Sequence, residues 1–331
     1  NFRAGVNAGN SIASGGNYNT VVGDEAGTAL TTGDNNVAIG FEALKTEDAH
    51  GDNVAVGYQA LKTLNAGADG FNVAVGYQAG LNVTTAVNNT IIGALAGDAL
   101  TTGNENVAVG FEALSTEDAN GGNTAVGSAV LKTQNAGGTA AFNTGVGYNA
   151  GLSVTTGIDN TLIGGGAGDA LTDADNNVAV GRNALGSDTL GSKSTALGRG
   201  ALGAQNFTTA TDSNNTAVGY TAGNSVTTGI QNVFVGSAAG LNVTTGVNIV
   251  AIGYQAGDAL TTGENNIAIG KNALGAEDTH DFNIAIGSNA LAAQNAGADA
   301  YNIAIGHNAG TAVTTGTENT LIGGLAGDAM T

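Results

Sequence analysis

The chain of 331 residues contains no cysteine, no proline and no tryptophan, and only 5% of its residues are aromatic. Without cysteine, disulfides and thiolate chemistry are excluded. Without proline, every backbone N–H remains available to a continuous ladder of hydrogen bonds. No apolar run reaches the roughly 18 residues that a membrane-spanning helix requires. We therefore expect no membrane insertion in this segment and a fold that holds together without cross-links.

Basic residues are also scarce. Eight Lys and Arg residues stand against 27 Asp and Glu residues, which gives a formal net charge of −19 at pH 7. Because the few basic residues are scattered, they form no patch for a phosphate backbone, and nucleic acid is not an expected partner. An acidic composition of this kind is typical of a solvated surface that keeps a protein soluble.

Glycine, by contrast, is abundant, with 56 residues. A five-residue pattern ends on glycine and recurs at a nearly constant interval of 17 residues: Asn, a β-branched residue, Ala or a larger apolar residue, Val or Ile, then Gly. A short fixed period is typical of a solenoid, in which each coil buries its apolar face only by stacking on the next. The repeat glycines are Gly5, Gly23, Gly40, Gly57, Gly76, Gly93, Gly110, Gly127, Gly147, Gly164, Gly181, Gly198, Gly219, Gly236, Gly253, Gly270, Gly287, Gly306 and Gly323.

Each repeat predicts one short strand. Residues 36–40, NVAIG, are too few for a helix and rich in β-branched side chains. We expect Ile39, the residue before the glycine, to point into the interior. Ala38 then lies on the opposite face, because strand side chains alternate. That face is apolar too, and a strand with two apolar faces needs cover on both. We therefore expect the face of Ala38, Ala55 and Ala74, or its partner face, to be buried between copies of the chain.

The predicted fold is all-β: a parallel β-solenoid, or β-roll, of about nineteen 17-residue coils. Asn stands four residues before the repeat glycine in all coils but two, where Ser194 and Ile249 replace it. Coil stacking would bring these side chains about 4.8 Å apart and allow an amide ladder. The alternative is that Asn serves only as a turn residue that tolerates left-handed backbone.

A longer period of about 70 residues, four coils, lies above the first. We interpret residues 1–331 as a single repeat array, and its internal order predicts a segment of a longer fibre. Insertions that recur on one level of a solenoid usually project from its surface. They are expected here at residues 62–71, 132–142, 203–214 and 292–301.

The repeats resemble those of known fibrous families. NNVAIG at residues 35–40 and TAVG at residues 216–219 resemble the repeat of trimeric autotransporter adhesin heads. NVAVGYQAG at residues 72–80 and NIAIGHNAG at residues 302–310 are similar to the arrays of phage and bacterial fibre proteins that precede an endosialidase-type chaperone domain. The resemblance implies a left-handed β-roll in which three chains pack together as a homotrimer.

No catalytic constellation is expected. The three histidines have no cysteine to pair with, and the repeated carboxylates are copies of one loop, so the chain is not expected to be an enzyme. That acidic loop suggests oxygen ligands for calcium, although its spacing matches neither an EF-hand nor a calcium roll. The alternative is a solvated acidic surface. The candidate metal ligands are Glu47, Asp48 and Asp52, beside His50, and Glu277, Asp278 and Asp281, beside His280.

Aromatic residues follow several repeat glycines, as at Phe41, Tyr58 and Tyr77. They either offer platforms for sugars or close a corner of the coil and pack between chains. The hypothesis that follows is an extracellular, non-enzymatic fibre or adhesin rod, such as a tail fibre or cell-adhesion protein, that serves surface attachment or displays a receptor-binding tip. Its partners would be copies of itself and a surface glycan or protein receptor. The alternatives are a glycan-binding module that uses the insertions and a filament-forming matrix protein.

Overall fold

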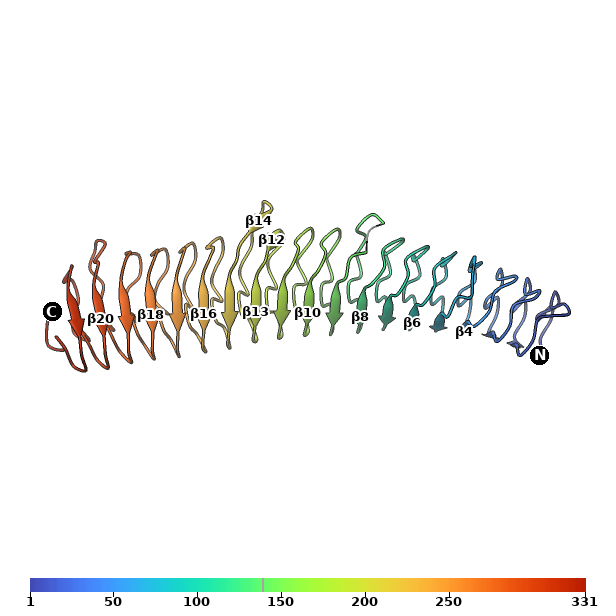
Figure 1. The fold of residues 1–331 in the computed structure, drawn as a ribbon, viewed down its shortest axis with the longest axis horizontal. Coiled ribbons are helices and arrows are strands. Elements are labelled where there is room, and N and C mark those ends of the chain that lie inside the picture. Colours follow the sequence, from blue (N-terminus) through green and yellow to red (C-terminus); the bar gives the residue numbers. More distant parts are fainter. Residues whose placement is uncertain (139) are drawn as a thin grey trace. The chain divides into compact units, whose positions relative to one another are not determined.

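A computed structural model of the chain describes residues 1–138 and 140–331, and these form two compact units, Asn1–Gly165 and Gly166–Thr331. The described residues contain short strands, turns and bends and no helix, so none of them lies in a helix able to cross a membrane. Within each unit the chain returns once per coil to the same ladder, and successive strands lie side by side (Figure 1). The predicted all-β parallel β-solenoid, of about nineteen coils, is confirmed.

Within the first unit, neighbouring strands of successive coils pair in parallel. The strands are β1 (Phe2–Ala4), β2 (Thr20–Val22), β3 (Val37–Ile39), β4 (Val54–Val56), β5 (Val73–Val75), β6 (Thr90–Ile92), β7 (Val107–Val109), β8 (Thr124–Val126), β9 (Thr144–Val146) and β10 (Thr161–Ile163).

The second unit repeats the arrangement and adds a short pair of strands. The ladder strands are β11 (Val178–Val180), β13 (Thr195–Leu197), β15 (Thr216–Val218), β16 (Val233–Val235), β17 (Val250–Ile252), β18 (Ile267–Ile269), β19 (Ile284–Ile286), β20 (Ile303–Ile305) and β21 (Thr320–Ile322). The additional pair joins β12 (Gly191–Ser192) to β14 (Thr211–Asp212), and β14 lies inside the insertion predicted at residues 203–214.

The register places equivalent residues above one another, as in the pairing of Ala38 with Ala55 and of Ile39 with Val56. Ala38 and Ala55 are fully buried inside their own coils, whereas Ile39 is 36% exposed. The expectation that Ile39 points inward is therefore wrong, and so is the suggestion that the alanine face lies between copies. A 17-residue coil is narrow, and the small side chain is the one that fits inside it.

Larger inward side chains are accommodated by glycine on the opposite wall. Where the inward residue is Ala38, the residue four after the repeat glycine is Leu44, and both are fully buried. Where it is Phe234, the same position is Gly240, and a β-carbon added there would lie 2.2 Å from the phenyl ring. Gly223 of the preceding coil lies against the other edge of the ring, where an added β-carbon would be 2.6 Å away. The core is thus filled by complementary volumes.

The repeat glycine is required by backbone approach. Gly40 has a φ of +131°, and a β-carbon there would lie 2.2 Å from the carbonyl oxygen of Gly57 in the next coil. No side chain fits between two backbones at that distance.

The asparagine column forms a ladder, and most of its bonds reach the backbone. Asn106 Oδ1 accepts the backbone N–H of Asn123 at 3.0 Å, and Asn106 Nδ2 donates to the carbonyl oxygen of Asn120 at 2.9 Å. Direct amide-to-amide bonds occur in some coils, as from Asn72 Nδ2 to Asn53 Oδ1 at 3.2 Å. The ladder therefore satisfies backbone groups of the adjacent turn as well as amides, which a simple amide stack would not do.

The insertions differ from one another. Gly67 and Gly297 lie in open space, since an added β-carbon at either would meet nothing within 4 Å. The insertion at 203–214 instead pairs with residues 191–192 through β12 and β14. The insertion at 132–142 includes Thr139, which lies outside the described residues.

Candidate functional site

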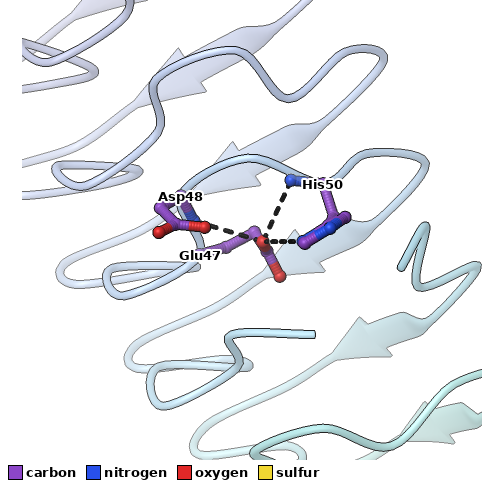
Figure 2. A group of neighbouring side chains, drawn as sticks. All are labelled: Glu47, Asp48 and His50. Atoms are coloured by element: carbon purple, nitrogen blue, oxygen red, sulfur yellow. Dashed lines mark hydrogen bonds and ion pairs between the residues drawn. The ribbon is translucent and has the colours of Figure 1, made fainter. Parts of the chain in front are cut away.

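The acidic loops bring part of each predicted metal-ligand set together. In the loop after β3, one ligand atom each from Glu47, Asp48 and His50 lies within 4.8 Å of the others. Figure 2 shows the Glu47 carboxylate at the centre of this group, facing the backbone N–H groups of Asp48 and His50. Asp52 lies outside the group, and its Oδ1 accepts a hydrogen bond from Asn35 Nδ2 at 3.1 Å.

The Glu47 side chain is fully buried, and its carboxylate caps the turn. Oε1 accepts N–H bonds from Asp48 at 3.1 Å and from His50 at 3.2 Å. Oε2 accepts the N–H of Ala66, in the next coil, at 3.1 Å. Burial raises the pKa of the Glu47 carboxyl, and these three bonds act in the opposite direction. Both oxygens are thus already engaged by backbone donors.

The copy of this loop in the second unit shares the two turn bonds to Oε1, but Glu277 Oε2 is buried and has no hydrogen-bond partner among the described residues, whereas Glu47 Oε2 is bonded to Ala66. Glu277 Oε1 accepts the N–H groups of Asp278 at 3.1 Å and of His280 at 3.2 Å. His280 Nδ1 approaches the same oxygen at 2.7 Å, which makes a carboxylate–imidazole pair. Asp281 again lies apart, where its Oδ1 accepts the N–H of Glu264 at 2.6 Å. Calcium binding at these two loops stays a prediction, with three residues grouped in each rather than the four clustered in the sequence.

Two further capping carboxylates were missed from the sequence. Glu117 and Asp188 are fully buried. Glu117 accepts the N–H of Asn120 at 2.9 Å, and Asp188 accepts the N–H of Phe207 at 3.0 Å. All four capping acids stand seven residues after a repeat glycine, a position held by buried Leu30, Val83 or Leu100 in other coils. This shared position in the repeat was the sequence signal that the four acids point inward.

A buried glutamine follows three of these acids in the next coil, and of the three only Gln205 donates to its acid, because Gln134 Nε2 and Gln294 Nε2 have no hydrogen-bond partner in the described part of the chain. Gln205 Nε2 donates to Asp188 Oδ2 at 2.6 Å, and Gln205 Oε1 accepts from Asn215 Nδ2 at 2.9 Å. The carboxylate is thereby tied to the asparagine ladder. Buried polar groups linked in this way fix one arrangement of a core. The site is chemically a set of internal caps, closed to solvent at its carboxylates.

The aromatic residues after the repeat glycines form a partly exposed stack in the first unit. The ring centroids of Phe41 and Tyr58 lie 5.3 Å apart, as do those of Tyr58 and Tyr77, and the rings are nearly parallel. Both faces of the middle ring are therefore covered by its neighbours. Phe282 and Tyr301 stack similarly at 5.0 Å in the second unit. In the three-ring stack, only the two outer rings have a face available to a sugar.

No family model, no curated protein and no solved structure matches this chain.

Proposed function

We propose that the chain is a non-enzymatic structural segment of an extracellular fibre or adhesin, whose copies associate, as homotrimers, through the outward face of the strand ladder. Such a fibre would serve surface attachment or hold a receptor-binding tip. The observation that carries the proposal is the aliphatic composition of that outward face.

The outward positions of each strand are its first and third residues, on either side of the buried one. They are Val, Ile, Leu or Thr in almost every coil, and the in-register pairing aligns them along each unit. Several remain more than a third exposed in the single chain, and a continuous aliphatic surface of this kind is typical of an interface. These residues are Ile39, Ile92 and Ile163 in the first unit and Leu197, Val218, Ile252, Ile305 and Ile322 in the second.

A second copy is a suitable cover for this face because each copy carries the same periodic surface. Identical surfaces related by rotation make closed assemblies without a separate partner. Three copies are the number that the sequence resemblance implies. The capping carboxylates support a structural role, since they are buried and hydrogen-bonded and offer no open catalytic group.

Light scattering of the purified chain tests the proposal. We expect a species with three times the 32.0 kDa chain mass. Replacing Ile92 with lysine should dissociate it, because a charge would be buried without a partner. Thr85→Lys, which adds the same charge at an exposed turn position, is the matched control and should leave the mass unchanged. A folded wild-type monomer would exclude association through this face.

Glycan binding by the insertions is the second candidate function. It is favoured by the open space around Gly67 and Gly297. Deleting residues 67–68 and 297–298 should then abolish binding to immobilised glycans and leave the melting temperature unchanged. Ala66 must be retained, because its N–H is bonded to Glu47.

A further inference from the structure

A polar groove of about 420 Å³ lies in the second unit, over the turns that follow β10, β11, β13 and β15. Its volume falls within the roughly 300–1,000 Å³ range of small-molecule sites. Three glycines among its lining residues, Gly186, Gly200 and Gly203, leave it without bulky side chains at those positions. The groove has no counterpart among the predictions from sequence.

Two arginines in this groove occupy equivalent places in successive coils. Arg182 follows the repeat glycine of one coil and Arg199 that of the next. The strands before them pair in register, Val180 with Leu197. Coil spacing therefore sets the two residues about 4.8 Å apart along the ladder at their backbones. Two positive charges carried by adjacent coils favour an anion bound between or beside them.

Neither guanidinium is neutralised by a carboxylate within 4 Å in the part of the chain that the structure describes. Arg199 donates to the Tyr220 hydroxyl at 3.1 Å and lies 5.6 Å from the centre of that ring. By contrast, Lys45, Lys132 and Lys193 each form an ion pair. Arg3 and Lys271 also have no ion pair among the described residues, but of the four unpaired basic residues only Arg182 and Arg199 lie in neighbouring coils.

The remaining lining groups suit a ligand rich in hydroxyls. The side chains of Asn183, Ser187, Thr221 and Asn224 supply neutral donors and acceptors. Asp169 supplies a carboxylate, and burial raises its pKa above the usual range. A carboxylate in such a site can accept a hydrogen bond from a hydroxyl, whereas it would disfavour a simple anion close to it. The lining therefore offers two arginines to bind one negatively charged group, and several polar side chains to bind hydroxyl groups.

We propose that this groove binds an acidic sugar residue of an oligosaccharide, with Arg182 and Arg199 contacting its carboxylate and the neutral side chains and Asp169 contacting its ring hydroxyls. Guanidinium groups match the planar geometry of a carboxylate and can bind it through two parallel hydrogen bonds. The proposal does not depend on association of the chains, because all the lining residues belong to one chain.

Calorimetric titration with two uronate probes, trigalacturonate and a hyaluronan tetrasaccharide, tests the proposal on the full chain. We expect at least one of them to bind. Its methyl ester, which keeps the sugar rings and removes the charge, should bind about 10-fold more weakly or worse. Inorganic phosphate, which has the charge without the rings, should also bind more weakly. Failure of both uronates at millimolar concentration, or equal affinity for the ester or for phosphate, would overturn the proposal.

Three variants locate the site. Arg182→Gln and Arg199→Gln should each weaken uronate binding by about 10-fold or more, since each removes a charged donor. Gly186→Leu should block the groove without changing the charge, because Gly186 has no left-handed φ and the nearest atoms to an added β-carbon lie 3.4 Å away. Lys271→Gln is the control, since Lys271 also follows a repeat glycine but lies outside the groove.

Equal weakening by Lys271→Gln would show binding through general charge and would refute the site. Unchanged binding in all three groove variants would do the same. Melting temperature and light scattering, measured on each variant, separate loss of the site from loss of the fold or of chain association. Unchanged uronate binding in the groove variants would contradict this site whatever their oligomer mass, and it would leave the fibre proposal standing.

Discussion

The contact between Phe234 and Gly240 allows a direct test of the volume rule in the core. Phe234→Ala removes the largest buried side chain, and such a change costs roughly 3–5 kcal/mol of unfolding free energy. Gly240→Leu alone brings the new side chain against the phenyl ring. Overpacking costs about 1–3 kcal/mol and a left-handed leucine about 1–2 kcal/mol.

The combined variant, Phe234→Ala with Gly240→Leu, recreates the pairing of Ala38 with Leu44. Leu44 has a φ of +49°, close to the +57° of Gly240, so the chain already places leucine in this backbone conformation. If the effects were independent, the losses would add to about 5–10 kcal/mol. We expect a loss lower than that sum by at least about 2 kcal/mol, because the leucine fills part of the space left by the ring.

Urea unfolding followed by circular dichroism measures the four stabilities of this cycle. Phe234→Ala with Gly257→Leu is the control pair, because the atoms nearest to Gly257 belong to other residues. That pair should be additive within about 0.5 kcal/mol. Additive losses for Phe234 and Gly240 as well would refute the idea that the core is filled by compensating volumes in opposite walls.

Three further outcomes follow from the structure. Asn106→Ala should lower the unfolding free energy by about 2–5 kcal/mol, because it leaves two buried backbone groups unpaired, and hydrogen exchange should localise the loss to the neighbouring coils. Bonds from Lys45 and Lys62 lower the pKa of Glu42 to about 2. The stability that the ionised carboxylate contributes is therefore present above its usual pKa of 4.5 and is lost as the pH falls towards 2. The melting temperatures of wild type and Glu42→Gln should converge in acid. Ala108→Asp should unfold its coil rather than merely separate copies, since Ala108 is buried inside the single chain, and circular dichroism distinguishes the two results.

The strands could be predicted because each carries its own signal. Residues 36–40 combine β-branched side chains with a glycine, and the structure places β3 there. The inward face could not be assigned, because Ala38 and Ile39 are both apolar and alternation alone makes their faces equivalent. Ala38 is the inward residue because the coil is narrow. That width depends on how the turns fold back and bury Leu44 together with the alanine.

The acidic loops show a different limit. Glutamate is rarely buried, so an exposed ligand set was the natural interpretation of Glu47 and Glu277. Their burial follows from unpaired N–H groups in the turn, which exist only once the turn has formed. The groove around Arg182 depends on which residues of four successive coils lie next to one another, and no local motif encodes that arrangement.

The pairing of each strand with only its two neighbours also bears on how such a chain changes over generations. Within a unit, a coil meets the next through the same register whether its neighbours are copies or variants. Unequal recombination between repeats could therefore add or remove whole coils while restoring that register at the junction. The number of coils can change by one at a time. A large inward side chain such as Phe234, in contrast, must be matched by glycine in its own coil and in the preceding coil. Selection would then act on pairs of adjacent coils rather than on single repeats.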